Sequence, residues 1–326
     1  MNQRPRRNRR SEAIREMTRE TNVSPDNLIF PLFLVDGSNI RETIPSLPVS
    51  QRLSTDQILH EIEVCLDYGL KRFMMFPAIP EPLKDKVASY SYHEDNFYLH
   101  TARMIAERFP EVCLISDVAM DPYSSDGHDG LVEEGQILND QTLPILAKMS
   151  VAQAQAGFAI LGPSDMMDGR IGFIRKALDK HGYNTTGIMS YTAKYASAFY
   201  GPFRDALDSA PKSGDKKTYQ MDPANKREAL IEATLDTAEG ADFLMVKPAL
   251  HYLDVIHLLK EKSSLPIAAY HVSGECAMLL AATQNGWLDY ETAMPETLLS
   301  LRRAGTDVII TYFAKDYAKK WKRDRG

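Results

Sequence analysis

Two lysines in the sequence close an apolar, strand-like run or follow one directly. Lys247 closes the run DFLMVKP, and Lys194 lies among aromatic residues in MSYTAKYASAFYGPF. An ammonium group among apolar side chains loses hydration, and a second ammonium nearby repels its proton, so both effects lower a lysine pKa. The neutral amine that results can attack a carbonyl carbon and form a Schiff base. Either lysine alone could simply reach from a strand end to solvent, but the pair favours carbonyl chemistry.

A group of acidic residues follows another apolar run, in DVAMDPYSSDGHDG. Its candidate ligands are Asp117, Asp121, Asp126, His128 and Asp129. Carboxylates and one imidazole could hold a hard cation, and Mg²⁺ suits them better than zinc because the segment has no thiolate. The same residues could instead form a turn in which polar side chains cap their own backbone. The residue types leave both interpretations open.

A long connection, residues 201–224, follows Lys194 in the chain and is too polar to be part of a core. Its length exceeds that of an ordinary strand-to-helix loop, which predicts a lid. Groups suited to a substrate carboxylate lie on it, although they are also typical of a solvated loop: Arg204, Lys216, Lys217 and Gln220. An arginine binds a carboxylate through two parallel hydrogen bonds. Ser273 and Tyr312 lie at or just after the ends of the last two apolar runs, where hydroxyl groups can hold a second carboxylate.

The elements that must position these groups repeat one pattern eight times: a short apolar run, a polar loop and an amphipathic helical stretch. The expected strands are residues 27–35, 72–78, 112–120, 158–163, 185–191, 242–248, 266–272 and 307–313. The clearest expected helices are residues 55–68, 139–155, 171–181, 225–239 and 291–304.

Near-continuous apolar strands are typical of parallel sheets that are buried on both faces. Eight such units, without a GxGxxG motif after the first, favour a closed α/β (TIM) barrel over an open sheet. A barrel enzyme carries its catalytic groups at the C-terminal ends of the strands.

The composition is that of a folded, globular chain. Of 326 residues, 44% are hydrophobic and 25% charged, which excludes a disordered protein. Cys65, Cys113 and Cys276 are odd in number and widely spaced, which indicates a reducing compartment without a structural zinc site. No apolar stretch is long enough to span a membrane, and no signal peptide is recognisable. We therefore expect a cytoplasmic protein without a membrane partner.

An arginine-rich arm precedes the first strand. The first ten residues contain five arginines and no acid, and removing them from the 38 basic residues leaves 33 against 44 acidic residues. We expect residues 1–26 to form an arm and residues 27–326 a single barrel domain. A basic arm on an acidic body could bind nucleic acid or pair with the acidic surface of a neighbouring copy. Nucleic acid is the less favoured partner, because the sequence lacks interleaved aromatic residues and a recognition-helix pattern.

Six collinear segments resemble those of the porphobilinogen synthase, or 5-aminolevulinate dehydratase, family. They are DVAMDPYSSDGHDG, PSDMMDGR, SYTAKYASAFYGPFRD, EGADFLMVKP, YHVSGE and TYFAK, and the resemblance spans nearly the whole chain. It implies a lyase that condenses two 5-aminolevulinate molecules to porphobilinogen with loss of two waters, an early step of tetrapyrrole synthesis. An imine makes a carbonyl group an electron sink, so this chemistry agrees with the lysine pair.

The resemblance also implies roles for individual residues. Lys247 matches the lysine that forms the Schiff base with the substrate supplying the propionate side, and Lys194 matches its partner at the other substrate. The implied substrate-binding residues are Asp117, Tyr200, Arg204, Lys216, Gln220, Ser273 and Tyr312. Ser273 and Tyr312 match the groups that hold the first carboxylate. Arg204 and Lys216 match the lid groups that hold the second.

The metal expectation depends on three positions. Zinc-dependent members carry cysteines where this chain has Ala119, Asp121 and Asp129, so zinc would lose its thiolate ligands and is not expected. The chain therefore resembles the zinc-independent, magnesium-responsive members, in which an activating, allosteric Mg²⁺ lies outside the active site near a glutamate. That glutamate is Glu232 here, which taken alone is typical of a solvated acid on a helix surface. The occupant of the Asp121 and Asp129 cluster stays open. Together with the arm, the resemblance implies a symmetric homo-oligomer, expected to be an octamer.

Two other functions remain possible from the sequence. A class I aldolase is also a Schiff-base barrel, but it needs one essential lysine, so turnover that survives Lys194→Ala would favour it. A binding barrel without catalysis would bind a ligand and would tolerate Lys247→Met. The intact set of lysines, hydroxyls and guanidinium argues against the second.

Overall fold

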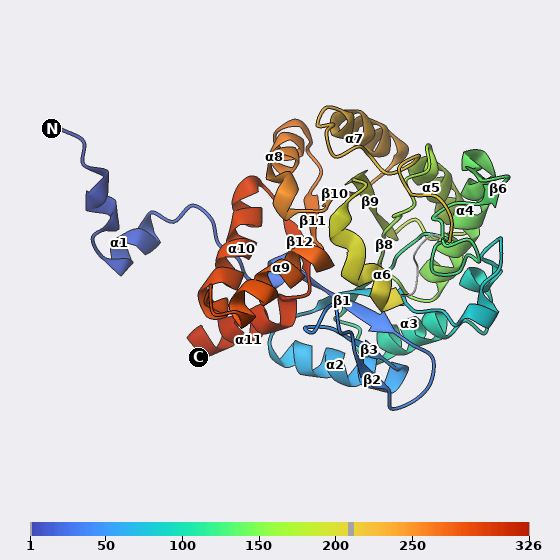
Figure 1. Ribbon diagram of the computed structural model, residues 1–326, viewed down its shortest axis with the longest axis horizontal. Coiled ribbons are helices and arrows are strands. Elements are labelled where there is room, and N and C mark those ends of the chain that lie inside the picture. Colours follow the sequence, from blue (N-terminus) through green and yellow to red (C-terminus); the bar gives the residue numbers. More distant parts are fainter. Residues whose placement is uncertain (1, 208–211, 326) are drawn as a thin grey trace.

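Eight parallel strands close into a barrel in the computed structural model, which describes residues 2–207 and 212–325 and omits the side chains of Arg204 and Asp205. The strands are β1 (Leu28–Leu34), β4 (Arg72–Pro77), β5 (Cys113–Ile115), β8 (Ile160–Leu161), β9 (Gly187–Lys194), β10 (Phe243–Lys247), β11 (Ile267–His271) and β12 (Val308–Thr311). They pair in that order, and β12 pairs with β1 to close the ring (Figure 1). The predicted barrel is confirmed.

Helices surround the barrel, as the amphipathic stretches predicted. They are α2 (Thr55–Asp67), α3 (Phe97–Arg108), α4 (Asn139–Gln155), α5 (Arg170–Lys180), α7 (Glu228–Glu239), α8 (Leu253–Lys262), α9 (Ser273–Gln284), α10 (Tyr290–Ala304) and α11 (Ala314–Arg325). The strands are buried because one face packs on these helices and the other on the barrel interior; all seven residues of β1 are buried. Two small hairpins, β2 (Arg41–Thr43) with β3 (Gln51–Leu53) and β6 (Val132–Glu133) with β7 (Gln136–Ile137), lie outside this pattern.

The strands differ from the expected bounds at one or both ends, and two of these differences concern the site. The fifth strand was expected over residues 185–191, but β9 runs from Gly187 to Lys194. The polar residues TAK looked like the start of a loop, yet they are buried against β10, so Lys194 ends the strand and does not follow it. The third strand was expected over residues 112–120, but β5 ends at Ile115. The acidic segment that follows it is an irregular chain over the barrel mouth.

The long connection was expected to be too polar for the core, and the structure corrects this in part. It begins with the short helix α6 (Gly201–Leu207), which lies across the barrel mouth in Figure 1. Ala206, Leu207, Lys216 and Gln220 are buried. The connection therefore packs down on the barrel, as a closed lid would.

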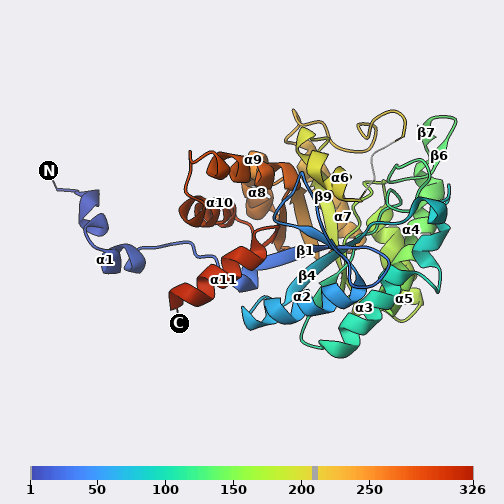
Figure 2. The ribbon, with the colours of Figure 1, turned by 60° about the horizontal axis from the view of Figure 1, so that its bottom comes forward.

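The N-terminal residues project away from the barrel. Residues 2–13 are exposed, including a 3-10 helix (Pro5–Arg9) and the first turn of α1 (Glu12–Met17). Figures 1 and 2 show this segment extended beside the β/α body, joined to β1 by an uncoiled stretch. Within residues 2–207 and 212–325, no helix is long and apolar enough to cross a membrane.

Candidate active site

The two predicted lysines end neighbouring strands of the barrel. Lys194 is the last residue of β9, Lys247 is the last residue of β10, and the two are register partners across the sheet. Lys194 is 5% exposed and Lys247 is 6% exposed. Parallel strands place their carboxyl ends at one mouth of the barrel, so both amines reach the same interior space.

Aromatic rings enclose the amine of Lys247. The centroids of Tyr270, Phe203, Tyr191 and Tyr200 lie 4.6, 5.0, 5.1 and 5.3 Å from its Nζ atom. Such rings attract a cation but replace little of the hydration it loses. Burial, and then the charge of Lys194, lower the pKa of Lys247 to about 7, against the opposing charge of Asp117. A large fraction of this amine is therefore neutral and nucleophilic near neutral pH.

Lys194 has polar partners instead. Its ammonium donates a hydrogen bond to the carbonyl oxygen of Ser164 and lies 3.5 Å from a carboxylate oxygen of Asp129. The ring centroid of Tyr191 is 5.9 Å from its Nζ, so this ring is near both amines. The two amines thus share one pocket but have different surroundings.

The acidic segment contacts the lid through one lysine. The Nζ atom of Lys216 lies 3.2 Å from Asp121 Oδ2 and 3.3 Å from Asp129 Oδ1. Burial and the charge of Asp129 raise the pKa of Asp121 to about 7, whereas Lys194 and Lys216 hold the pKa of Asp129 well below its usual range against the effect of burial. Asp129 therefore bridges the lid lysine and the strand lysine. The role of Lys216 in holding a substrate carboxylate stays a prediction.

The remaining members of the acidic segment have other surroundings. Asp117 is buried beside both lysines, and burial raises its pKa although Lys247 and Lys194 oppose the shift. The ring nitrogens of His128 lie 3.1 Å from the Tyr219 hydroxyl and 2.9 Å from the Ser213 carbonyl oxygen. Among residues 2–207 and 212–325, no group of three or more His, Cys, Asp or Glu side chains is arranged to hold a metal ion.

Three hydroxyl groups predicted to bind substrate lie close to the enclosure of Lys247. The hydroxyl of Tyr312 lies 3.1 Å from that of Tyr270, a ring of the Lys247 enclosure. Ser273, the first residue of α9, accepts a hydrogen bond of 3.0 Å at Oγ from the backbone N–H of Phe203 on the lid. The hydroxyl of Tyr200 lies 3.1 Å from the carbonyl oxygen of Lys247. The structure therefore brings these three predicted residues together around Lys247.

The predicted lid residues are only partly placed. The side chain of Arg204 lies outside the described part of the structure. Gln220 is buried, and its backbone N–H donates to the carbonyl oxygen of Lys216. Lys217, whose side chain is 75% exposed, pairs with Asp215 on the surface, away from the enclosed lysines.

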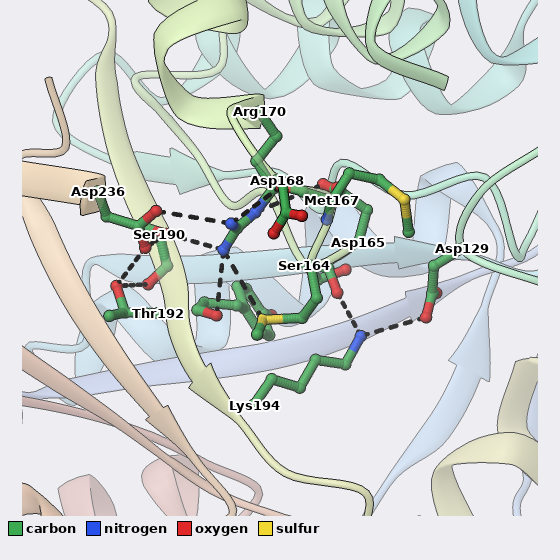
Figure 3. A network of polar contacts seen from close by, with 12 residues as sticks. Asp129, Ser164, Asp165, Met167, Asp168, Arg170, Ser190, Thr192, Lys194 and Asp236 are labelled. Atoms are coloured by element: carbon green, nitrogen blue, oxygen red, sulfur yellow. Dashed lines mark hydrogen bonds and ion pairs between the residues drawn. The ribbon is translucent and has the colours of Figure 1, made fainter. Parts of the chain in front are cut away.

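A buried network supports the Lys194 side of the pocket (Figure 3). Arg170, 2% exposed, lies 3.9 Å from a carboxylate oxygen of Asp165 and 3.5 Å from one of Asp236. Asp236 in turn accepts hydrogen bonds from Ser190 Oγ and Thr192 Oγ1, at 2.5 and 2.8 Å. The network fixes the loop that presents the Ser164 carbonyl oxygen to Lys194. The sequence offered no sign of it, because its members come from three separate elements.

Glu232 lies on α7, outside the barrel interior. It is half-buried, and burial and then the neighbouring acids, opposed by Arg170, raise its pKa to about 7. A cavity of about 310 Å³ adjoins it, and oxygen-bearing side chains line most of its wall, among them Asn139, Asp168, Asp222 and Glu228. These are the ligand types that Mg²⁺ prefers, and a bound cation would stabilise the carboxylate that burial disfavours.

Sequence reasoning missed the aromatic enclosure as a set. Phe203 and Tyr270 lie in segments that were quoted for other residues, and Phe203 packs on Phe76 with ring centroids 5.1 Å apart. The usable signal was the concentration of aromatic residues next to each polar strand end.

Fold and site together are those of a barrel enzyme that can act on carbonyl groups through an amine.

Comparison with known proteins gives the family. A family model described as delta-aminolevulinic acid dehydratase matches residues 2–320. The chain is 53% identical over 314 residues to the delta-aminolevulinic acid dehydratase of Chlamydia pneumoniae, covering 96% of this chain and 95% of that one. It is 55% identical over 313 residues to the chloroplastic enzyme of Physcomitrium patens, covering 95% and 72%. The chain belongs to the delta-aminolevulinic acid dehydratase family, whose members are lyases.

A solved structure agrees with this assignment. Delta-aminolevulinic acid dehydratase (porphobilinogen synthase) of Toxoplasma gondii, in complex with the reaction product porphobilinogen, superposes with a TM-score of 0.96. Its sequence is 50% identical, and the match covers 98% of this chain and 91% of that one.

Proposed function

We propose that this chain is a porphobilinogen synthase that condenses two molecules of 5-aminolevulinate to porphobilinogen with loss of two waters, in tetrapyrrole synthesis. The register pairing of Lys194 with Lys247, with a Lys247 pKa near 7, carries the proposal. Family membership and the product named in the Toxoplasma gondii complex support it.

The enclosed amine begins the reaction. Neutral Lys247 adds to the ketone of the first substrate, and loss of water gives an imine. A second imine, between Lys194 and the second substrate, withdraws electrons so that the carbon beside it can lose a proton and bond to the imine carbon on Lys247, which leaves the propionate chain of the first substrate intact. The amino group of the first substrate then displaces Lys194, and Lys247 leaves as the ring forms, so the two waters are those lost in the two imine-forming steps. Ser273 and Tyr312 hold the first carboxylate through their hydroxyl groups. The aromatic rings exclude water that would compete for the imine.

Lys194 serves the second substrate in this proposal. Its contacts with Asp129 and Ser164 hold the amine beside Lys247, so two like molecules are ordered in one pocket. Fixing two reactants in this way is worth several kcal/mol of barrier, up to about 7–11 kcal/mol in the best oriented cases. Arg204, Lys216 and Gln220 on the lid are proposed to hold the second carboxylate.

The test is turnover of 5-aminolevulinate by the purified chain, with porphobilinogen identified by mass spectrometry. We expect product from the wild-type chain and none from Lys247→Met or Lys194→Met. Turnover that persists in Lys194→Met would favour an aldolase-like reaction with one essential lysine instead.

We further propose that Mg²⁺ activates the enzyme at Glu232, and that zinc is not required. The oxygen-lined cavity beside Glu232 and the absence of thiol side chains at positions 119, 121 and 129 support this. Mg²⁺ usually keeps several of its waters and takes only one or two carboxylates from a protein. Glu232→Gln should keep basal activity and lose the stimulation by added Mg²⁺, whereas the exposed Glu261→Gln should keep both. Equal stimulation of Glu232→Gln and the wild type would refute the site.

We also propose a homo-oligomer, an octamer, in which the arm of one copy contacts the barrel of the next. The exposed arginines of residues 2–10 and the net acidic remainder of the chain support it. Deletion of residues 1–20 should lower the oligomer number measured by light scattering; an unchanged number would refute the role of the arm.

The same arginines are not expected to bind nucleic acid, and salt-sensitive retention on DNA that is lost with the arm would overturn that expectation. A cytoplasmic location stays a prediction, supported by three cysteines that are all free thiols.

A further inference from the structure

Glu275 has a buried carboxyl group that contacts two separate segments of the barrel mouth. The residue is 1% exposed and occupies the third position of α9. One oxygen, Oε2, accepts a hydrogen bond of 2.9 Å from the N–H of Val272. The other, Oε1, accepts bonds of 2.8 and 3.3 Å from the N–H groups of Leu250 and His251.

The second set of bonds goes beyond helix capping. A glutamate at this position of a helix ordinarily reaches back to the residue before the helix, as Oε2 does here. Leu250 and His251 belong to a different element, the turn that directly follows Lys247 and Pro248 at the end of β10. The same side chain therefore ties the end of β10 to the start of α9. A buried carboxyl group that accepts hydrogen bonds from several backbone donors is a geometrically specific restraint.

Ser273 lies two residues before Glu275 and shares its turn. Its Oγ accepts the N–H of Phe203, whose ring lies 5.0 Å from the Lys247 Nζ. A Cβ atom at Gly274 would lie 2.5 Å from the backbone oxygen of Phe199, so this turn also touches the base of the lid. The spacing between the amine of Lys247 and the hydroxyl of Ser273 thus depends on how the turn of α9 is held.

We infer that Glu275 is a positioning residue that sets the carboxylate-binding hydroxyl of Ser273 at a fixed distance from the Schiff-base amine of Lys247. The inference rests on the proposed function, in which one substrate molecule contacts both groups. Glu275 itself touches no substrate. A fixed distance between the two groups makes the enzyme selective. The amine of Lys247 should react faster with a ketone that carries a carboxylate at the correct spacing than with a similar ketone that carries none.

The test compares two ketones that differ only in that carboxylate. The full-length protein is incubated with 4-oxopentanoate, which is the substrate without its amino group, or with 2-pentanone, and the imine is trapped with cyanoborohydride. Peptide mass spectrometry gives the rate of adduct formation on Lys247. The measured quantity is the ratio of the two rates, which a general loss of folded protein does not change because it lowers both rates equally.

Glu275→Gln keeps the size of the side chain but replaces one acceptor oxygen by an N–H₂ group. Glu275→Asp keeps the carboxylate for Val272 but is too short to reach Leu250 as well, so it serves if the first variant folds poorly. We expect both variants to lower the ratio by roughly tenfold, because small errors in the placement of reacting groups have effects of that order. Glu291→Gln, at an exposed acid in the first turn of α10, is the matched control and should leave the ratio unchanged.

Each outcome decides between the inference and the function it rests on. A wild-type chain that prefers 4-oxopentanoate, with the same ratio in both Glu275 variants, would overturn the role of Glu275 and leave the proposed function intact. A wild-type chain that forms no Lys247 adduct with either ketone would overturn the proposed function, and the inference with it.

Discussion

Lys194 and Lys247 are direct neighbours across β9 and β10, each as the last residue of its strand. This pairing places two amines in one buried space while their surroundings differ: aromatic rings face Lys247, and Asp129 and the Ser164 carbonyl oxygen face Lys194. Unequal surroundings allow one amine to be neutral beside a charged neighbour, which is the condition for a nucleophilic lysine.

The first prediction concerns the pH dependence of imine formation. The charge of Lys194 helps to lower the pKa of Lys247, so Lys194→Met should raise that pKa and move the pH profile upward. In the wild type, the trapping rate should rise about tenfold between pH 6 and pH 8, as the neutral fraction of a group with a pKa near 7 does. The measurement is the trapping rate with cyanoborohydride across this range. A midpoint in Lys194→Met at or below that of the wild type would contradict the account, and Lys217→Met serves as the exposed control.

The second prediction concerns the stability cost of Lys247. Its folded-state pKa of about 7 is below that of the unfolded chain, so the unfolded state binds more protons between about pH 7 and 10. The penalty is therefore full below pH 7 and decreases as the pH rises above it. Lys247→Met should abolish activity yet raise the thermal unfolding midpoint, more at pH 6 than at pH 9, by an energy on the order of a few kcal/mol. A variant that is destabilised at both pH values would show that the amine is not desolvated.

The third prediction concerns the contact between the lid and the acidic segment. Lys216→Met removes the ammonium that contacts both Asp121 and Asp129, and leaves Asp129 its contact with Lys194. Removing one partner of a buried ion pair costs about 3–5 kcal/mol. The loss in the free energy of unfolding should be smaller at pH 5 than at pH 8, because Asp121, with a pKa near 7, is protonated at pH 5. Denaturant unfolding at both pH values checks this, and an equal loss in the exposed Lys217→Met would contradict it.

The fourth prediction concerns the base of the lid. Gly274→Ala would place a methyl group 2.5 Å from the backbone oxygen of Phe199 and 2.8 Å from its Cα, so the lid must shift. We expect kcat/KM for 5-aminolevulinate to fall by roughly tenfold, since a displacement of about 1 Å can cost up to a hundredfold. Gly201→Ala is the control, because within the described residues no atom lies within 4 Å of an added Cβ there. Full activity in Gly274→Ala would show that lid placement is not limiting.

Local patterns predicted the barrel and the location of its chemistry. The strands are apolar runs of a few residues, so their number and approximate bounds follow from the sequence, and Lys247 is visible at the end of such a run. Lys194 was placed beyond its strand because Thr192 and Lys194 look like loop residues; they are strand residues because β10 covers them. Barrel closure buries polar residues that a single strand would expose.

Contacts between distant segments could not be predicted in this way. Lys216 is 87 residues from Asp129 along the chain, and Glu275 is 25 residues from Leu250. Each pair meets only because the barrel brings loop ends to one mouth. The lid looked too polar for the core for the same reason, because the partners of its buried lysine lie on another loop.

The most direct test of the account is where a substrate adduct forms. The protein is incubated with 5-aminolevulinate and borohydride, which reduces an imine to a stable amine, and is examined by intact and peptide mass spectrometry. We expect a substrate adduct on Lys247 that is absent without substrate. Folded protein with no adduct on Lys247 or on Lys194 would contradict Schiff-base catalysis at the ends of β9 and β10.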